Sequence, residues 1–224
     1  MLIQIENHRI VLTRKRIKNI NLRLSAEGAL RVSAPLNCPL PVIENFLNSK
    51  REWIGTRLGH SSPEKAALHY VNGEMHWFQG KKYRLLVQET NLTPGVRLEH
   101  DCLHCLVSPN ASFEEKKKLV FGWYRTEMLE IVPALLTQWE ETIGVKSRDW
   151  VIKDMKTRWG SCHLIKKRIC LNLKLMQKPL DSLEYVLVHE LVHLLEASHN
   201  HRFHALMSQF MPDWKQRKKG LMRV

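Results

Sequence analysis

Within residues 185–203, three side chains that are costly to bury interrupt the run of Val and Leu at residues 186–195. His189 and His193 are four residues apart, so on a helix they lie on one face, with about 5–6 Å between their Cβ atoms. Two imidazoles at that spacing can bind one tetrahedral metal ion. Glu190 lies beside them, where its carboxylate can accept a proton from metal-activated water. This HExxH pattern predicts His189 and His193 as metal ligands and Glu190 as the general base.

The competing interpretation is an ordinary buried histidine that is hydrogen-bonded within the core. In this segment two histidines and one glutamate share a helix that is otherwise mostly Val and Leu. Each would need its own partner, because an unpaired buried polar group costs about 1–3 kcal/mol. One cation would compensate the burial of both imidazoles and of the carboxylate, so we favour the metal site.

Catalytic zinc usually takes three protein ligands and keeps one position open. We favour His199 as the third ligand, because a turn after the helix would bring its ring back over His189 and His193. His204 and Glu196 are the other candidates. We expect His201 at the surface or beside the substrate. The expected cofactor is one Zn²⁺ ion, although three histidines also suit Ni²⁺, Co²⁺ or Mn²⁺.

Most of the elements that must position these residues can be predicted from periodicity and turn residues. Alternating apolar and polar residues predict strands in residues 1–36, with a turn at 26–28, and helical spacing predicts a helix over 40–59. Gly73 and Gly80 frame short strands, and residues 97–107 supply a hairpin partner. Residues 112–144 predict a long helix that can bend at Pro133.

The C-terminal part is predicted to hold two paired strands, within residues 145–163 and 168–176, followed by helices over 181–197 and 201–210. Asp181 can cap the first of these helices, and Glu184, three residues later, completes the pattern of a capping box.

The composition bounds the class of protein. The 224 residues carry a formal charge of +13 and include five cysteines. No apolar run reaches membrane-spanning length and no secretory signal is evident, so we expect a cytoplasmic protein with reduced thiols and no membrane partner. Cys102 and Cys105 form a single CxxC without a second, which favours a structural role. The basic charge would suit a nucleic acid as partner, but no motif accompanies it, so nucleic acid is a weak candidate.

Residues 155–207 resemble the YgjP-like zincin family, relatives of the SprT-like and WLM-type metallopeptidases, described as predicted metal-dependent hydrolases. The N-terminal hairpins and helix share the resemblance, which spans nearly the whole chain. Members usually have Asn where this chain has Ser198, and often Trp where it has His204. The matching motifs are Arg158-Trp159-Gly160-Ser161-Cys162, Leu171-Asn172, Tyr185-Val186, the His189–His193 segment and Ser198-His199.

The resemblance implies an α+β fold, with a β-rich N-terminal region and a helix at residues 1–110 and a zincin-like half at residues 111–224. The alternative is that the two form one continuous domain. It places the active-site helix beside a small sheet built from strands 153–159 and 169–173, whose edge strand can pair with a peptide. Arg158 could hold an anion or stabilise an oxyanion, while Trp159 packs the core or meets the substrate. In the alternative interpretation, in which the motif at residues 158–162 is a structural turn, Gly160 permits a chain reversal. The other candidate substrate-binding residues are Asn172, His201 and His204.

Three functions remain open at the level of sequence. The first is a zinc-dependent hydrolase of the metallopeptidase type, acting on peptides. The second is a nucleoside triphosphate (UTP-type) pyrophosphatase on the same metal site, which the basic residues favour. The third is a non-catalytic nucleic-acid-binding protein with a structural metal, although a structural site would close its fourth position with a protein ligand. The oligomeric state is open.

Overall fold

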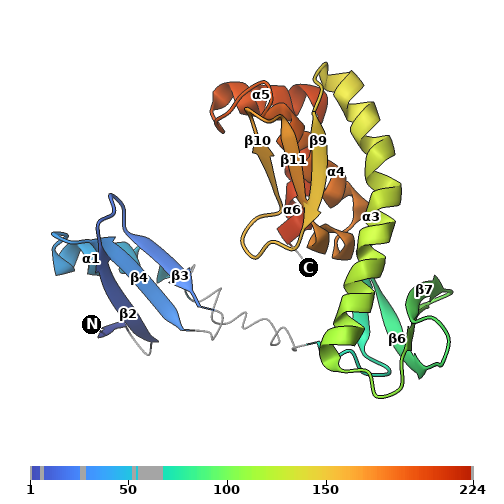
Figure 1. Cartoon of the computed structure of the whole chain (residues 1–224). Coiled ribbons are helices and arrows are strands. Elements are labelled where there is room, and N and C mark those ends of the chain that lie inside the picture. Colours follow the sequence, from blue (N-terminus) through green and yellow to red (C-terminus); the bar gives the residue numbers. More distant parts are fainter. Residues whose placement is uncertain (1, 6–7, 26–28, 52–53, 55–67, 223–224) are drawn as a thin grey trace. The chain divides into compact units, whose positions relative to one another are not determined.

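The computed structural model describes residues 2–5, 8–25, 29–51, 54 and 68–222, and confirms the predicted α+β class (Figure 1). The chain divides into two compact units, Met1–Leu68 and His69–Val224. The boundary expected near residue 110 falls inside the second unit, between β8 (Cys102–Val107) and α3 (Phe113–Ile143), which contact each other. No helix in the described part of the chain is long and apolar enough to cross a bilayer.

The first unit is a four-stranded sheet with one helix. The strands lie in the order β1-β2-β4-β3, with β2 and β4 parallel and the other pairs antiparallel. Apolar residues at alternate strand positions and on one side of α1 form its core, so the strands predicted within residues 1–36 are confirmed. The expected turn at 26–28 and the helix end near Gly59 lie outside the described residues. The bounds are β1 (Leu2–Ile5), β2 (His8–Lys15), β3 (Asn21–Leu24), β4 (Leu30–Pro35) and α1 (Leu40–Asn48).

The second unit begins with another four-stranded sheet, in the order β5-β6-β8-β7. Gly73 and Gly80 have φ values of +86° and +79°, as turns that frame strands require. Cys105 is buried and Cys102 half-buried, and they occupy opposite faces of β8, so the CxxC cannot act as a metal clamp. The bounds are β5 (Met75–Phe78), β6 (Lys81–Glu89) and β7 (Gly95–Glu99).

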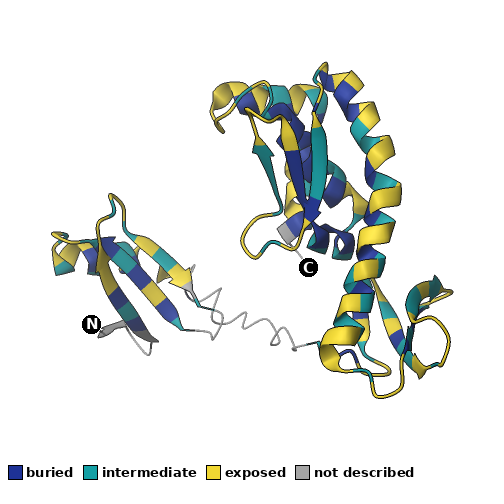
Figure 2. Ribbon diagram, viewed as in Figure 1, coloured by how far each residue is buried: buried dark blue, intermediate teal, exposed yellow. Residues whose placement is uncertain are grey.

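Helix α3 connects this sheet with the C-terminal part of the unit. Ser112 and Glu115 form a capping box at its start, and Gly144 ends it in the left-handed conformation. The helix continues through Pro133. Its exposed outer side is yellow in Figure 2, while Tyr124 donates a hydrogen bond to the Trp77 carbonyl at 2.6 Å. One long helix thus spans both parts of the unit.

The C-terminal sheet has three strands, in the order β10-β11-β9: β9 (Asp149–Lys153), β10 (Gly160–His163) and β11 (Arg168–Asn172). β10 is antiparallel and β9 parallel to β11. The prediction of a strand over residues 153–159 is wrong, because β9 ends at Lys153 and a loop follows. The Asn172 side chain holds that loop by donating to the carbonyls of Met155 and Arg158, which takes the loop out of the sheet.

Helices α4 (Leu180–Val192), α5 (His201–Phe210) and α6 (Trp214–Met222) complete the unit, after the 3-10 turn η1 (Leu173–Gln177). The predicted capping box at Asp181 and Glu184 is wrong. Pro179 is the N-cap and makes no side-chain bond. Glu184 instead accepts hydrogen bonds from Trp139, at 2.9 Å, and from Arg217 of α6. Helix α4 also ends earlier than expected, at Val192 rather than Ala197.

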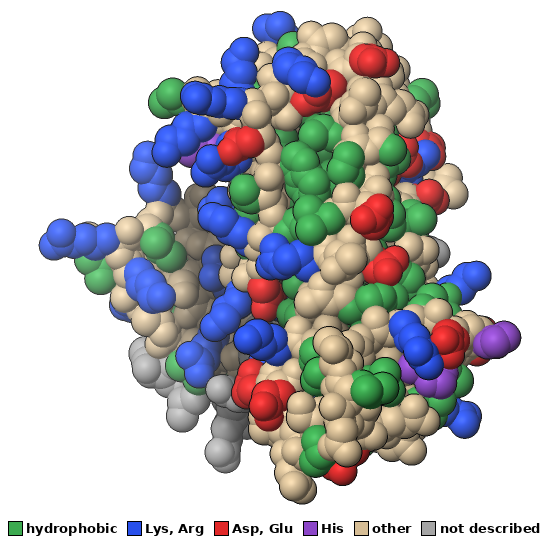
Figure 3. Space-filling model, turned by 45° about the vertical axis from the view of Figure 1, so that its right-hand side comes forward, with side chains coloured by type: hydrophobic (Ala, Val, Ile, Leu, Met, Phe, Trp, Pro, Cys, Tyr) green, Lys and Arg blue, Asp and Glu red, His purple; other side chains and the backbone are tan. Residues whose placement is uncertain are grey.

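Burial is concentrated around α4. Ile169 and Leu171 of β11 have 0% exposure and face this helix, most of whose residues are buried (dark blue in Figure 2). The excess of basic residues is visible at the surface, where Lys and Arg side chains gather along the upper left of the face drawn in Figure 3. The buried helix α4 is therefore the element on which a precise site can be built.

Candidate metal centre

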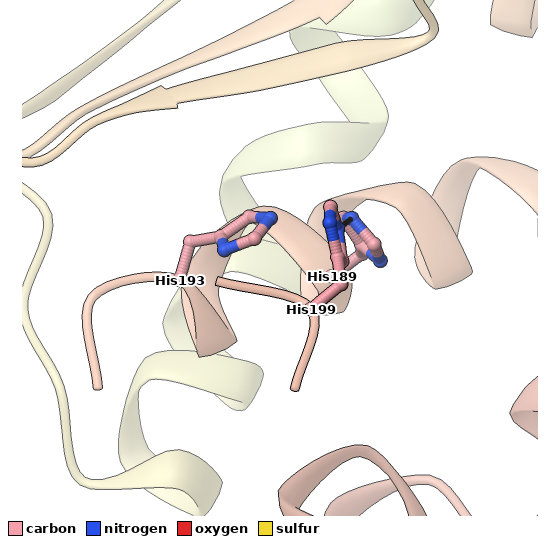
Figure 4. A group of neighbouring side chains, drawn as sticks. All are labelled: His189, His193 and His199. Carbon is pink, nitrogen blue, oxygen red and sulfur yellow. Dashed lines mark hydrogen bonds between the residues drawn. The ribbon is translucent and has the colours of Figure 1, made fainter. Parts of the chain in front are cut away.

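Three histidine rings meet beside the C-terminal end of α4. His189 lies in its last turns, His193 is its C-cap, and His199 follows in the loop before α5. One ring nitrogen from each lies within 4.8 Å of the other two, and the Nε2 atoms of His189 and His199 are 2.8 Å apart. Figure 4 shows the three rings gathered around a common space. The structure thus brings together the two helix histidines and the favoured third ligand.

The chemistry of these nitrogens fits a metal ion. Burial, followed by the neighbouring rings of His193 and His199, lowers the pKa of His189 to about 3, so this imidazole stays neutral. His193 Nδ1 lies 3.1 Å from the carbonyl oxygen of Glu196. This oxygen can only accept a hydrogen bond, so Nδ1 of His193 carries the proton and Nε2 of His193 carries the lone pair. His189 Nδ1 is buried without a hydrogen-bond partner in the described part of the chain. Neutral imidazoles with free lone pairs are what a divalent cation requires.

Phe203 supports the three rings from α5. Its side chain is 1% exposed, and its ring centroid lies 4.9 Å from that of His189 and 4.7 Å from those of His193 and His199. Asn200 caps α5 by accepting from the Phe203 backbone N–H at 3.0 Å. Phe203 was not predicted as part of the site. The available signal was Asn200, a favoured N-cap residue directly before the predicted helix over 201–210, because such a cap places Phe203 in the first turn of that helix.

The other candidate ligands lie apart from this group. The Glu196 carboxylate accepts from the backbone N–H and the hydroxyl of Ser198, at 3.2 and 3.1 Å, and so stabilises the turn that carries His199. The His204 ring stacks on Trp214, with centroids 5.5 Å apart and an angle of 8°. His201 is exposed at the first position of α5. Glu196 and His204 therefore have other contacts that explain their positions.

Glu190 is buried between α4 and β10, with 5% exposure. Burial raises the pKa of its carboxyl to about 8, opposed by the positive charge of Arg158 and by a hydrogen bond from the Cys162 backbone N–H. A carboxyl group with a pKa near neutrality can both accept and release a proton at physiological pH.

Gly160 allows the close approach of β10 to Glu190. A Cβ atom at this position would lie 2.6 Å from Glu190 Oε1 and 2.8 Å from Val186 Cγ1. Gly160 is the first residue of β10 and its φ is not positive, so the structural turn that the sequence left as one alternative is wrong. The glycine is needed because the strand passes too close to α4 for any side chain.

A pocket of about 340 Å³ contains these groups. Arg158, an exposed residue, forms part of its rim. Cys162 also lines it, and burial together with the charge of Glu190 raises the pKa of its thiol to about 11, so it is no thiolate nucleophile. Trp159 is half-buried outside the pocket, with Lys178 Nζ 5.4 Å from its ring centroid. The lining residues are Arg158, Gly160, Ser161, Cys162, Leu164, His189, Glu190, His193, Ala197 and His199.

Asn172, a predicted substrate contact, is 2% exposed and has a different set of partners. It donates to the carbonyls of Arg158, at 2.6 Å, and Met155, at 2.8 Å, and accepts from the Lys174 backbone N–H at 3.1 Å. These bonds fix the loop that carries Arg158 to the pocket, so Asn172 positions that loop.

Replacing Asn172 by Ala is expected to lower the free energy of unfolding by about 2–4 kcal/mol, because two carbonyls and the N–H groups of Met155 and Lys174 lose their partner. Chemical denaturation measures this loss. Asn91→Ala is the control, since Asn91 is exposed in the same unit and should change stability by less than about 0.5 kcal/mol. A stability equal to that of the wild type would show that these bonds do not hold the loop.

Residues 18–224 match the family described as YgjP-like, metallopeptidase domain. The match covers most of the chain, so the protein belongs to the YgjP-like family, as the sequence resemblance predicted. It is accordingly a metal-dependent hydrolase of metallopeptidase type, for which the family implies a catalytic metal.

Two solved structures show local similarity. The zymogen of Pyrococcus abyssi abylysin, a metallopeptidase, is 22% identical, with a TM-score of 0.38, and the match covers 41% of this chain and 92% of that one. The metallopeptidase zymogen of Methanocaldococcus jannaschii jannalysin is 19% identical, with a TM-score of 0.37, and the match covers 41% and 94%. None of the curated proteins compared with the chain matches it.

Proposed function

We propose that this protein is a peptidase in which His189, His193 and His199 hold one divalent cation, Zn²⁺ in the first place, and Glu190 is the general base. The observation that carries the proposal is the shared pocket: a buried carboxyl and three imidazoles line the same small space. When bound there, the cation supplies Lewis acidity, which polarises a carbonyl oxygen and makes water more acidic.

Glu190 moves the proton in this proposal. Its carboxylate takes a proton from the attacking water and delivers it to the amine that leaves, which is the sequence of events in general acid–base catalysis. The Cys162 N–H holds one end of the side chain, and the backbone at Gly160 packs against it. The carboxylate therefore has a fixed orientation, which proton transfer requires.

The edge strand β10 supports a peptide as the substrate. Among the described strands it pairs with β11 alone, and three of its residues, Gly160, Ser161 and Cys162, border the pocket. An extended peptide can add to such an edge through main-chain hydrogen bonds, which places its own carbonyls beside the pocket. A nucleoside triphosphate is the second candidate substrate, favoured by Arg158 at the rim.

The substrate class is tested by incubating the zinc-loaded protein with unfolded casein and with a panel of nucleoside triphosphates. We expect peptide fragments that disappear on chelation and return when zinc is restored. Pyrophosphate release with the same metal dependence would select nucleotide hydrolysis instead. If neither product forms while RNA or DNA is retarded in a strongly salt-dependent way, the protein is a binding module.

Zinc is expected to stabilise the metal-free protein. A ligand at 1,000 times its dissociation constant contributes about 4 kcal/mol, so the midpoint of thermal unfolding should rise by roughly 10 °C. His199→Ala should remove most of this shift, whereas His201→Ala, at an exposed neighbouring histidine, should keep it. Scanning calorimetry with and without zinc measures both. An unchanged shift in His199→Ala would remove His199 from the site.

A further inference from the structure

A second pocket, of about 590 Å³, lies on the outer face of the C-terminal sheet. The register of β9, β10 and β11 places Ile169 and Leu171 on the inner face, towards α4. The alternate residues point the other way, and six of them line this second pocket, which we call the outer groove. They are Val151, Lys153, Ser161, His163, Arg168 and Cys170.

The outer groove has a basic rim of four cations, of which only Arg168 forms an ion pair within the described residues. Arg168 is neutralised by Asp149, with Arg168 Nη2 2.6 Å from Asp149 Oδ2. By contrast, the side chains of Lys153, Arg158 and Lys166 line the groove and make no hydrogen bond or ion pair within the described ranges. Arg158 and Lys166 act on the carboxyls of Glu190 and Asp149 through their charge, without forming an ion pair with them. Three cations around one concave surface attract a ligand with several negative charges.

The floor and one end of the outer groove are apolar. Val151, Met155 and Cys170 line it, and the β10–β11 hairpin carries Leu164 and Ile165, which are 43% and 93% exposed. No aromatic side chain other than His163 is among the residues that line the groove. Single-stranded nucleic acid binds chiefly by stacking its bases on aromatic rings, so this lining suits acidic and apolar side chains better.

The outer groove adjoins the candidate metal centre across β10. Arg158, Ser161, Cys162 and Leu164 line both pockets, and β10 separates them. In an extended peptide paired with β10, successive side chains point to opposite faces of the sheet. Every second side chain would therefore lie over the outer groove, while those between them would face the metal centre.

We propose that the outer groove selects the substrate, by binding acidic side chains at alternate positions of an extended peptide that pairs with β10. This inference rests on the proposed peptidase function and adds the substrate class: acidic, strand-forming peptides. Arg158 and Lys166 supply the positive charge nearest β10. Lys153 lies on β9, at the opposite edge of the sheet, and adds to the positive field of the groove. The apolar floor contacts the side-chain stems.

The test measures binding and cleavage separately, with end-blocked fluorescent peptides about eight residues long, which is the length of a long strand. The first peptide alternates Glu and Leu, and the second alternates Lys and Leu. A third has the composition of the first, arranged as one block of Leu and one of Glu. Fluorescence anisotropy with the zinc-loaded full chain gives the dissociation constants, and mass spectrometry of the same mixtures detects cleavage.

The alternating Glu peptide is expected to bind about tenfold more tightly than the Lys peptide, since two or three rim pairs each change affinity a few-fold. It should also bind more tightly than the block peptide, and the preference should weaken at high salt. The double variant Lys153→Glu/Lys166→Glu should abolish the preference. Lys81→Glu/Arg84→Glu makes the same charge change at exposed positions of β6 and should keep it.

The outcomes separate this inference from the proposed function. Tight binding of the acidic peptide without zinc-dependent cleavage would support the outer groove and contradict the peptidase. Cleavage that ignores peptide charge would support the peptidase and overturn the selective role of the groove. An RNA oligomer that displaces the acidic peptide and binds more tightly at equal charge would overturn the choice of a peptide as occupant. Equal binding by both double variants would also overturn the proposal.

Discussion

Replacing Glu190 by Gln is expected to lower kcat by about 10²–10⁴-fold, the usual contribution of a general base, without loss of the bound metal. The amide is close in size to the carboxyl, so it fits the space between α4 and β10. It cannot accept the proton that hydrolysis releases. The three imidazoles are unchanged, so the cation should stay bound.

Initial rates on casein, together with elemental analysis of the same sample, measure this expectation. Glu196→Gln is the matched control, because Glu196 is exposed and its role is to accept hydrogen bonds from Ser198, which the amide oxygen can also do. Its rate should stay within a few-fold of the wild type. A Glu190→Gln enzyme with wild-type kcat would exclude Glu190 as the base.

Replacing Gly160 by Ala is expected to damage both stability and activity. The added methyl carbon would lie 2.6 Å from Glu190 Oε1, so either the strand or the carboxylate must move. Overpacking of this kind costs about 1–3 kcal/mol of folding free energy. A displaced base loses its alignment, for which a rate reduction of about 10²-fold is typical.

Gly122→Ala provides the opposite case. Gly122 lies in α3, and a Cβ atom there would have no neighbour within 4 Å. Alanine in a helix interior is more stable than glycine by about 0.5–1 kcal/mol. Denaturation and activity assays on both variants should therefore give stability changes of opposite sign, with activity lost in Gly160→Ala alone. If Gly160→Ala retained wild-type stability and rate, the close packing of β10 on Glu190 would be disproved.

The parts of the site that could be predicted from sequence are those governed by local spacing. His189 and His193 face the same way because a helix repeats about every four residues. Apolar alternation and glycine positions likewise predicted most strands of the two N-terminal sheets. The position of His199 followed from the need for a third ligand and from the turn after the helix.

The remaining features depend on contacts between residues far apart in sequence. Glu184 matched the pattern of a capping box, yet its carboxylate accepts a hydrogen bond from Trp139, 45 residues earlier. Residues 154–159 read as a strand, but Asn172 ties them into a loop. Gly160 resembled a turn glycine, and its reason became visible once β10 lay against α4. The helix α6 was missed because four of its nine residues are Lys or Arg and no regular apolar spacing marks it, and it is held by contacts of Trp214 and Arg217.

The central claim is that His189, His193 and His199 together bind one cation. X-ray absorption spectroscopy of the protein loaded with one equivalent of zinc tests this most directly. The account predicts three imidazole nitrogens at about 2.0–2.1 Å and one further light atom, with one imidazole lost in His199→Ala. A zinc–sulfur distance of about 2.3 Å, or an imidazole count that is the same in His199→Ala, would contradict it.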